Sequence, residues 1–520
     1  MKKKRQFLTV VSVVLGLTIT AVFMSPSLLM AEESFWSGGD ITKYISPELA
    51  EELDALLAKV ADEILMSFFM DPGVPEDAPT GVIVYERGKT WDGYTLLSIE
   101  AGHFDPETGI TSGAVLIDME GKIVKEWQVI AEPARLFPGG YVMGGWGVYE
   151  EFTGITQLVQ LDWDGNKMWE WNGYDSSYPD APYHSGFHHD YQREGNPVGY
   201  YVPGMDPKIT GGKTLIMSHY IPPLEWTANI TKHPLFDETL YEVDWEGNLT
   251  WEWYMWEHFD QLGFDEVAKE AIYEDYVGRI PDVGTDYAHA NSATYLGPNK
   301  WHEQGDLRFH PDNIMIDCRT NGIAVIIARH DDPDGRWKEG DIVWKIGPDY
   351  SYAKPEYKLG QIIGMHQAHM IPRGLPGAGN ILLFDNGGFG GFGSLMPGLK
   401  PTATNKLRDY SRVIEFNPIT LDIVWEYKNT ENRYDNGKLV EMKMFSVFNS
   451  GAQRLINGNT LICSGLNARV LEVTPEGKIV WDFMSPYGGG ESSMSFMGSK
   501  SIYRAERIPY SYIPEELLNK

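Results

Sequence analysis

The chain has 520 residues, of which 42% are hydrophobic and 22% charged, as in a folded protein rather than a disordered one. It carries 43 Lys and Arg against 73 Asp and Glu, so its formal net charge is −30. That acidity argues against nucleic acids and anionic membrane surfaces as partners held by bulk charge. Aromatic residues make up 13% of the chain, and 55 Gly and 31 Pro supply many turns, which favours a β-rich protein over a helical bundle.

The N-terminus is predicted to be a secretory signal peptide over residues 1–31. Residues 2–5 are basic, residues 7–24 form an apolar run, and Ala31 places a small residue at the cleavage site. An uncleaved membrane anchor is the alternative, because the apolar run is nearly long enough to span a bilayer. Cleavage gives a periplasmic or secreted protein without membrane contact.

Residues 32–110 are expected to form a helical and extended segment that packs on the main domain. Ser46 can cap a helix and Pro47 suits its first turn. An apolar stripe at helical spacing follows, formed by Leu49, Leu53, Leu56, Val60 and Ile64. The stripe would cover the main domain or a second copy of the chain, so a homodimer stays open.

A recurring hairpin phrase fills residues 111–510. Each copy has an apolar strand, in most copies an Asp-Gly or Glu-Gly turn, and a second strand that ends in an aromatic residue; the copies end at Trp127, Trp171, Trp253, Tyr427 and Trp481. Four strands in each of about six repeats, with no long helix between them, predict an all-β domain that is a six-bladed β-propeller. Residues 511–520 form a C-terminal tail. A series of β-sandwich domains is the alternative.

Histidines gather at three places, each shortly before an expected inner strand. The clusters are His184, His188 and His189 beside Asp190; His289 with Asn291; and His366 with His369. Inner strands of a propeller surround one channel, so we expect the clusters at one mouth, together with Arg319 at the end of the strand 314–317. A histidine nucleophile or base supported by Arg and Asn suits attack on an anionic group.

Metal chemistry is the other interpretation of the first cluster, because imidazoles and Asp190 are competent ligands. His184 and His188 have i,i+4 spacing, but Gly186 interrupts it, so no metal is assigned. The acidic segment 331–335 is similar to a calcium loop, yet His330 occupies its first ligand position, which favours a surface turn. The two cysteines form no haem or zinc pattern, and whether they pair stays open.

Five phrases, in order along the chain, resemble the bacterial arylsulfate sulfotransferase family. They are Phe187-His-His-Asp190, His289-Ala-Asn-Ser292, Asp317-Cys-Arg319, His366 with residues 379–387, and residues 451–461. The family is a periplasmic six-bladed propeller that moves a sulfuryl group between phenols without a nucleotide sulfate donor. The resemblance therefore implies phenolic sulfates and phenols as partners and no cofactor.

The resemblance also implies a role for each matching residue. His366 matches the nucleophile that becomes transiently sulfated, which makes the reaction ping-pong. His289 and Asn291 match sulfate-binding residues, and Arg319 matches the cation that faces the sulfuryl oxygens.

The His188–His189 pair matches the remaining active-site histidine, with either residue as the match. The sequence departs from the family pattern at Met365, where members commonly have Gln, and His369 is an additional substrate-binding candidate. Two other classes stay open. A quinone-dependent propeller dehydrogenase commonly carries adjacent cysteines or a fused haem site, which this sequence lacks. A non-catalytic interaction propeller would not need histidines at matching positions.

Overall fold

The computed structural model describes residues 74–75, 77–150, 154–173, 184–274, 285–351, 353–388, 390–393, 402–406, 408–490 and 500–519. The predicted signal peptide and the helical stripe from Leu49 to Ile64 lie outside these ranges. Among the described residues, no helix has the length and apolar character needed to cross a membrane.

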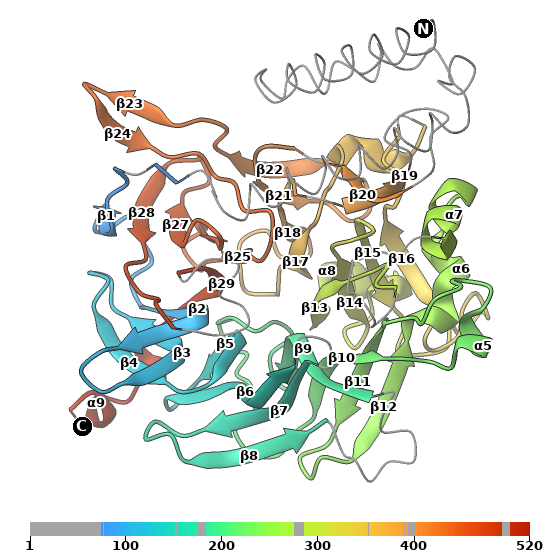
Figure 1. The fold of residues 1–520 in the computed structure, drawn as a ribbon, viewed down its shortest axis with the longest axis horizontal. Coiled ribbons are helices and arrows are strands. Elements are labelled where there is room, and N and C mark those ends of the chain that lie inside the picture. The colour runs from blue at the N-terminus through green and yellow to red at the C-terminus, as the bar shows by residue number, and fades with distance from the viewer. Residues whose placement is uncertain are drawn as a thin grey trace, which may run out of the picture.

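The described strands form antiparallel sheets that stand around a common centre (Figure 1). Four of these sheets are separate blades of four or five strands. The first contains β29 (Ile502–Ile508), β2 (Tyr94–Asp105), β3 (Ile110–Ile117) and β4 (Ile123–Trp127). The second contains β13 (Ala290–Tyr295), β14 (Ile314–Cys318), β15 (Ile323–Ile327) and β16 (Ile342–Ile346). The third contains β17 (His366–Met370), β18 (Ile381–Asp385), β21 (Arg412–Phe416) and β22 (Ile423–Lys428). The fourth contains β25 (Gly451–Arg454), β26 (Thr460–Ser464), β27 (Arg469–Val473) and β28 (Ile479–Met484), with β1 (Gly81–Tyr85) at its edge.

The remaining large sheet has eight strands. They are β5 (Ile130–Phe137), β6 (Tyr141–Glu150), β7 (Gly154–Leu161), β8 (Lys167–Asn172), β9 (His184–Arg193), β10 (Thr214–Tyr220), β11 (Asp237–Val243) and β12 (Leu249–Tyr254). Two runs of four strands merge in it because β7 pairs with β9 at Ile155 and Phe187. Gly186 permits this approach, since a Cβ there would lie 2.0 Å from the Ile155 carbonyl oxygen. The all-β propeller arrangement is confirmed, and the prediction of six separate blades is corrected to four separate blades and one eight-stranded sheet.

Helices in the described residues are short and lie outside the sheets. They are α5 (Leu224–Thr227), α6 (Phe259–Leu262), α7 (Glu266–Glu274), α8 (Lys300–Glu303) and α9 (Glu515–Leu518), with 3-10 turns η3 (Met255–His258), η4 (Leu307–Phe309), η5 (Pro355–Leu359) and η7 (Tyr510–Tyr512). Two further hairpins pair β19 (Gly390–Gly393) with β20 (Thr402–Lys406) and β23 (Arg433–Asp435) with β24 (Lys438–Glu441).

Strands from the two ends of the described chain close the ring. The late strand β29 pairs with β2, and the early strand β1 pairs with β28 (Figure 1). The innermost strands β29, β5, β9, β13, β17 and β25 contact one another in that order, and β25 contacts β29 again. Residues at the ends of these strands therefore meet at the centre although they lie far apart in sequence.

Five tryptophans on outer strands, of which Trp253 and Trp481 end a hairpin phrase, tie one sheet segment to the next. The indole N–H on an outer strand donates to a backbone carbonyl in the hairpin turn of the following segment, at 2.8–3.0 Å. The pairs are Trp169 to Trp245, Trp253 to Gly340, Trp344 to Pro418, Trp425 to Pro475 and Trp481 to Met119. This contact with the neighbouring segment explains the endings Trp253 and Trp481, because a buried indole favours an acceptor.

Candidate active site

The ends of the inner strands bring four of the predicted residues together at the centre. The His189 ring on β9 lies 4.9 Å from the His289 ring, which immediately precedes β13. The Arg319 amide, directly after β14, donates to the His289 carbonyl at 2.9 Å. The charges of Arg319 and His289 both act on His366, the first residue of β17, and lower its pKa.

Backbone strain gathers at the same place. His189, His289, Gln367 and Asn449 have positive φ values of 57°, 49°, 52° and 57°, although none of them is glycine. In each of the pairings of β9, β13 and β17 the register shifts nearby, so every one of these inner strands carries an irregularity. Non-glycine residues rarely adopt this conformation, and they tend to cluster at functional sites.

His366 is buried, with 2% of its surface exposed, and its two ring nitrogens have different environments. Nδ1 lies 2.8 Å from Asn386 Oδ1 and 3.0 Å from the Gly364 carbonyl oxygen, both of which only accept. Nδ1 therefore carries the proton, and Nε2 carries the lone pair, which accepts the Asn449 amide at 3.1 Å. Burial lowers the pKa of His366 to about 3, so the imidazole is neutral at physiological pH.

Arg319 is a cation without a counterion in the described part of the chain. Its guanidinium stacks on the Phe448 ring at 4.0 Å, and its Nε has no hydrogen-bond partner among the described residues. Burial lowers the pKa of Arg319 to about 10, partly opposed by Asp286. A partly buried guanidinium left unpaired beside a neutral imidazole forms a site for an anion.

His289 is paired with a carboxylate. Its Nδ1 lies 2.6 Å from Asp286 Oδ2, and its amide donates to the other carboxylate oxygen at 2.8 Å. The Asp286 carboxylate fixes the ring orientation and leaves Nε2 for a ligand.

The structure distinguishes His189 from His188. His189 contacts His289, whereas His188 stacks flat on His219 at 3.6 Å between ring centroids. His188 Nδ1 lies 2.8 Å from His189 Nδ1, and His188 Nε2 lies 3.1 Å from Glu238 Oε2. His189 is therefore the member of the pair at the centre, and His188 connects it to a buried carboxylate.

His188, His219 and Glu238 also form a group that could hold a metal ion. The two imidazole planes are parallel within 4°, so their in-plane lone pairs run side by side rather than toward one point. Asp190, the ligand considered from the sequence, is taken up by arginines instead, and the His184 side chain lies outside the described residues.

Asn291 and His369 are buried next to the centre, but their side chains are used within the protein. Asn291 Nδ2 donates to the Met365 carbonyl at 3.2 Å, which joins β13 to β17. His369 Nε2 lies 2.8 Å from the Tyr200 hydroxyl, and its Nδ1 lies 2.9 Å from the Gln367 carbonyl. Burial lowers the pKa of His369 to about 4.

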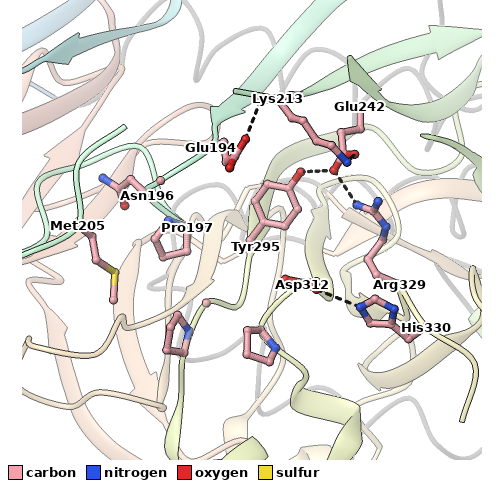
Figure 2. Close-up of a pocket in the computed structure, with 14 residues that line it drawn as sticks. Glu194, Asn196, Pro197, Met205, Lys213, Glu242, Tyr295, Asp312, Arg329 and His330 are labelled. Atoms are coloured by element: carbon pink, nitrogen blue, oxygen red, sulfur yellow. Dashed lines mark hydrogen bonds and ion pairs between the residues drawn. The ribbon is translucent and has the colours of Figure 1, made fainter. Parts of the chain in front are cut away.

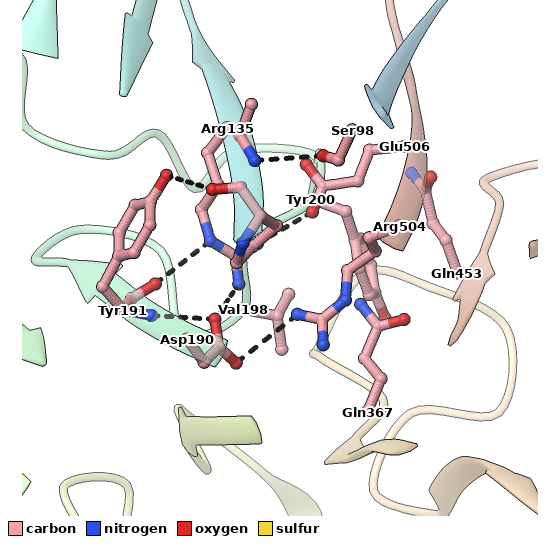
Figure 3. Close-up of polar contacts among 12 residues, drawn as sticks. Ser98, Arg135, Asp190, Tyr191, Val198, Tyr200, Gln367, Gln453, Arg504 and Glu506 are labelled. Carbon is pink, nitrogen blue, oxygen red and sulfur yellow. Dashed lines mark hydrogen bonds and ion pairs between the residues drawn. The ribbon is translucent and has the colours of Figure 1, made fainter. Parts of the chain in front are cut away.

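Beneath the centre lies a network of buried charges that the sequence analysis did not find (Figure 3). Asp190 accepts from Arg135 and lies 3.6 Å from Arg504, while Arg135 also bonds Glu506 at 2.8 Å. Asp190 further accepts the Ala293 amide of the next inner strand at 3.1 Å. The network fixes β5, β9, β13 and β29 relative to one another, and the histidine-bearing strand ends with them.

The acid and amide partners of the histidines were also missed. Asp286, Asn386 and Asn449 each bond a central histidine, and Glu238 closely contacts His188 behind it. Asp286 is three residues before His289, a spacing that could have indicated it. Nothing local in the sequence indicates the other three.

The fold and the centre define the class of protein: a β-propeller with a cluster of imidazoles and one guanidinium where its inner strands meet. Residues 227–480 match the family model described as Arylsulfotransferase (ASST). The match covers just under half of the chain; it supports the arylsulfotransferase family assignment, and this family domain supports a sulfotransferase function. The match includes His289, Arg319 and His366, whereas His188 and His189 precede it.

No curated protein matches the chain. Among solved structures, a protein of unknown function from Bacteroides caccae is 11% identical, with 80% of this chain and 99% of that chain covered and a TM-score of 0.38. A streptogramin B lyase is 9% identical, with coverages of 78% and 88% and a TM-score of 0.30. The Dos1 propeller is 8% identical, with coverages of 80% and 76% and a TM-score of 0.30. Similarities this low carry no argument about this chain.

Proposed function

We propose that the protein transfers a sulfuryl group from a phenolic sulfate ester to a phenolic acceptor, without a nucleotide sulfate donor, in two steps through a sulfated His366. The observation that carries the proposal is a buried neutral imidazole that shares one centre with a guanidinium to which no carboxylate is paired among the described residues. The imidazole supplies a nucleophile and the guanidinium a site for the sulfuryl oxygens.

The first step uses the lone pair of His366 Nε2. This atom attacks the sulfur, the bond from sulfur to the phenolic oxygen breaks, and the phenolate leaves in line. A neutral nucleophile avoids adding negative charge to the anionic ester, and the bonds from Nδ1 to Asn386 and Gly364 stabilise the positive charge that the sulfated ring acquires. The Nε2 lone pair exchanges its bond from the Asn449 amide for the bond to sulfur.

Arg319 donates to the equatorial sulfuryl oxygens as charge develops on them. One well-placed donor of this kind contributes about 2.7–4 kcal/mol to the transition state. Because no carboxylate pairs with Arg319 in the described residues, an incoming sulfate does not have to displace one.

His289 is the best-equipped residue to move the phenol proton. Asp286 holds its ring in place, and His289 gives a proton to the departing phenolate at the phenolic oxygen. In the second half-reaction the neutral His289 takes the proton of the incoming phenol, whose oxygen attacks the sulfur and releases His366. His289 packs against His189. His189 in turn contacts His188, which lies next to the Glu238 carboxylate, and these contacts hold the His189 ring in position.

The central test is to trap the sulfated enzyme. Incubation with a nitrophenyl sulfate in the absence of acceptor is expected to add the mass of one sulfuryl group to the peptide that contains His366, and His366→Ala is expected to abolish both the adduct and transfer. His103→Ala serves as the control, because His103 contacts Tyr487 and lies outside the cluster. An adduct on another residue, or transfer by His366→Ala at the wild-type rate, would refute the nucleophile.

His289→Asn tests the proton transfer separately. Loss of the acid is expected to slow sulfation by esters of weakly acidic phenols far more than by nitrophenyl sulfate, whose phenolate leaves without a proton. Equal slowing with both donors would contradict the role of His289 as the acid.

We further propose that the protein is exported by its signal peptide and acts in the periplasm or outside the cell on small phenolic sulfates and phenols. N-terminal sequencing of the protein purified from its native location tests cleavage after Ala31, and recovery only with membranes would instead support an anchor.

A further inference from the structure

A second group of histidines lies at the other end of the β13–β16 sheet from Arg319. Strand β14 begins two residues after Asp312 and ends directly before Arg319, so Asp312 and the catalytic centre are at opposite ends of it. His310 precedes Asp312, and His330 follows β15. None of the residues proposed for sulfuryl transfer belongs to this group.

The side chains of this group converge. His330 Nε2 lies 3.0 Å from Asp312 Oδ2, and His310 Nδ1 lies 3.7 Å from the same oxygen. The ligand atoms offered by His310, Asp312 and His330 all lie within 4.8 Å of one another. The rings of His310 and His330 are 4.4 Å apart and inclined by 71°, so unlike the stacked pair at the centre they can direct lone pairs toward one point.

We propose that His310, Asp312 and His330 bind a zinc ion, with the neighbouring His302 imidazole available as a fourth ligand. The His302 ring, on α8, lies 4.8 Å from the His310 ring at 76°. Three imidazoles and one carboxylate suit the tetrahedral preference of zinc, whereas calcium and magnesium require mainly oxygen ligands.

The protonation state of the group suits a metal. The Asp312 amide donates to His310 Nδ1 at 3.2 Å, so that nitrogen carries a lone pair. A deprotonated imidazole is the form that binds metal.

Other charged groups nearby are already paired. The adjacent acidic turn, which is similar to a calcium loop in sequence, has Asp331 paired with Lys338 and Asp332 with Arg336, confirming it as a surface turn. Asp312 and His330 also line a cavity of about 630 Å³ (Figure 2). An ion held by them lies at the cavity wall, where solvent and chelators reach it.

The test is a titration of chelator-treated wild-type protein with Zn²⁺ in a calorimeter, which measures the heat of zinc binding. We expect one equivalent to bind, with proton release that increases at lower pH, and a Co²⁺-substituted sample to show the absorption bands of tetrahedral cobalt. Loss of an outer-shell partner weakens metal binding by about 10–100-fold. His330→Ala and His310→Ala each remove a direct ligand, so each is expected to weaken zinc binding by at least that factor. Asp312→Asn tests the carboxylate with little change of shape, and the Zn²⁺-induced rise of Tm is measured for every variant.

His103→Ala is the control and is expected to bind zinc like wild type. Unchanged zinc affinity in the His310→Ala, His330→Ala double variant would overturn the proposal and place the ion elsewhere, as would octahedral rather than tetrahedral cobalt bands. Neither result bears on sulfuryl transfer, because the site shares no residue with the centre.

Discussion

Replacing Arg319 with Met is expected to make the free protein more stable and the enzyme much slower. Met keeps an unbranched apolar side chain against Phe448, on which the guanidinium now stacks at 4.0 Å. It removes a charge that has no counterion among the described residues.

The size of the stability gain follows from the lowered pKa. Burial moves the pKa of Arg319 from 12.5 to about 10. At about 1.36 kcal/mol per pKa unit, the charged form is disfavoured by about 3 kcal/mol. Arg319 is only partly buried and solvent screens its charge, so we expect a gain of about 1–2 kcal/mol in the free energy of unfolding. Loss of the donor is expected to reduce kcat/KM by about 10²–10³-fold.

The measurement is a thermal unfolding curve for each variant, with and without inorganic sulfate, beside the transfer rate. Sulfate is expected to raise the Tm of wild type and not that of Arg319→Met, because bound anion restores the missing counterion. Arg329→Met is the matched control. Arg329 stacks on Trp251 at 4.1 Å in the same way but pairs with Glu242 at 3.0 Å, so its loss should lower the Tm and leave transfer unchanged.

Two results would refute this reasoning. A lower Tm for Arg319→Met would mean that the guanidinium is already satisfied in the free protein. Transfer at the wild-type rate would mean that the sulfuryl oxygens are bound elsewhere.

Three further predictions concern buried groups. Asp190→Asn is expected to lower the free energy of unfolding by about 3–5 kcal/mol in denaturant titrations, because two buried guanidiniums lose their shared carboxylate; a loss below 1 kcal/mol would contradict it. Asn386→Ala removes one acceptor from His366 Nδ1 and is expected to reduce kcat by up to about tenfold, since Gly364 still accepts; an unchanged kcat in steady-state assays would contradict this. Burial raises the pKa of Glu132 to about 8, so the folded state keeps a proton that the unfolded chain loses above about pH 4.5. Between pH 5 and 8 the free energy of unfolding of wild type should therefore fall by about 1.4 kcal/mol per pH unit relative to that of Glu132→Gln. Parallel curves of unfolding free energy against pH for the two proteins would refute this.

The repeating hairpin phrase was sufficient to predict sheets around a centre, because its period and turn chemistry are local. Its aromatic ending also has a local signature, although the carbonyl that each indole bonds belongs to the next segment. The merging of two runs of strands into one sheet was not predictable in the same way. It depends on the close approach of Gly186 to Ile155, which sequence periodicity does not encode.

The sequence analysis expected each histidine cluster shortly before an inner strand, which holds for His289 before β13 but not for the other two clusters, which lie within β9 and β17. It also did not show which histidines face the centre. His366 and His369 are both on β17, yet Gln367 between them has a φ of 52° and the register shifts there. The shift turns His369 toward Tyr200 while His366 faces Asn386. A similar φ of 57° at His189 separates it from His188. Irregularities of this kind depend on neighbouring strands, so single-sequence patterns do not reveal them.

The departures from a relaxed structure are concentrated where the ligand is expected. Left-handed residues, a guanidinium with no counterion among the described residues and an imidazole held neutral by burial all raise the free energy of the empty centre. An anionic ligand relieves only the second of these, and it does so at Arg319, next to the nucleophile. If the proposed transfer is correct, binding energy is gained at the sulfate group rather than at the phenol ring, so we expect sulfate esters of differing phenols to serve as donors and differing phenols as acceptors.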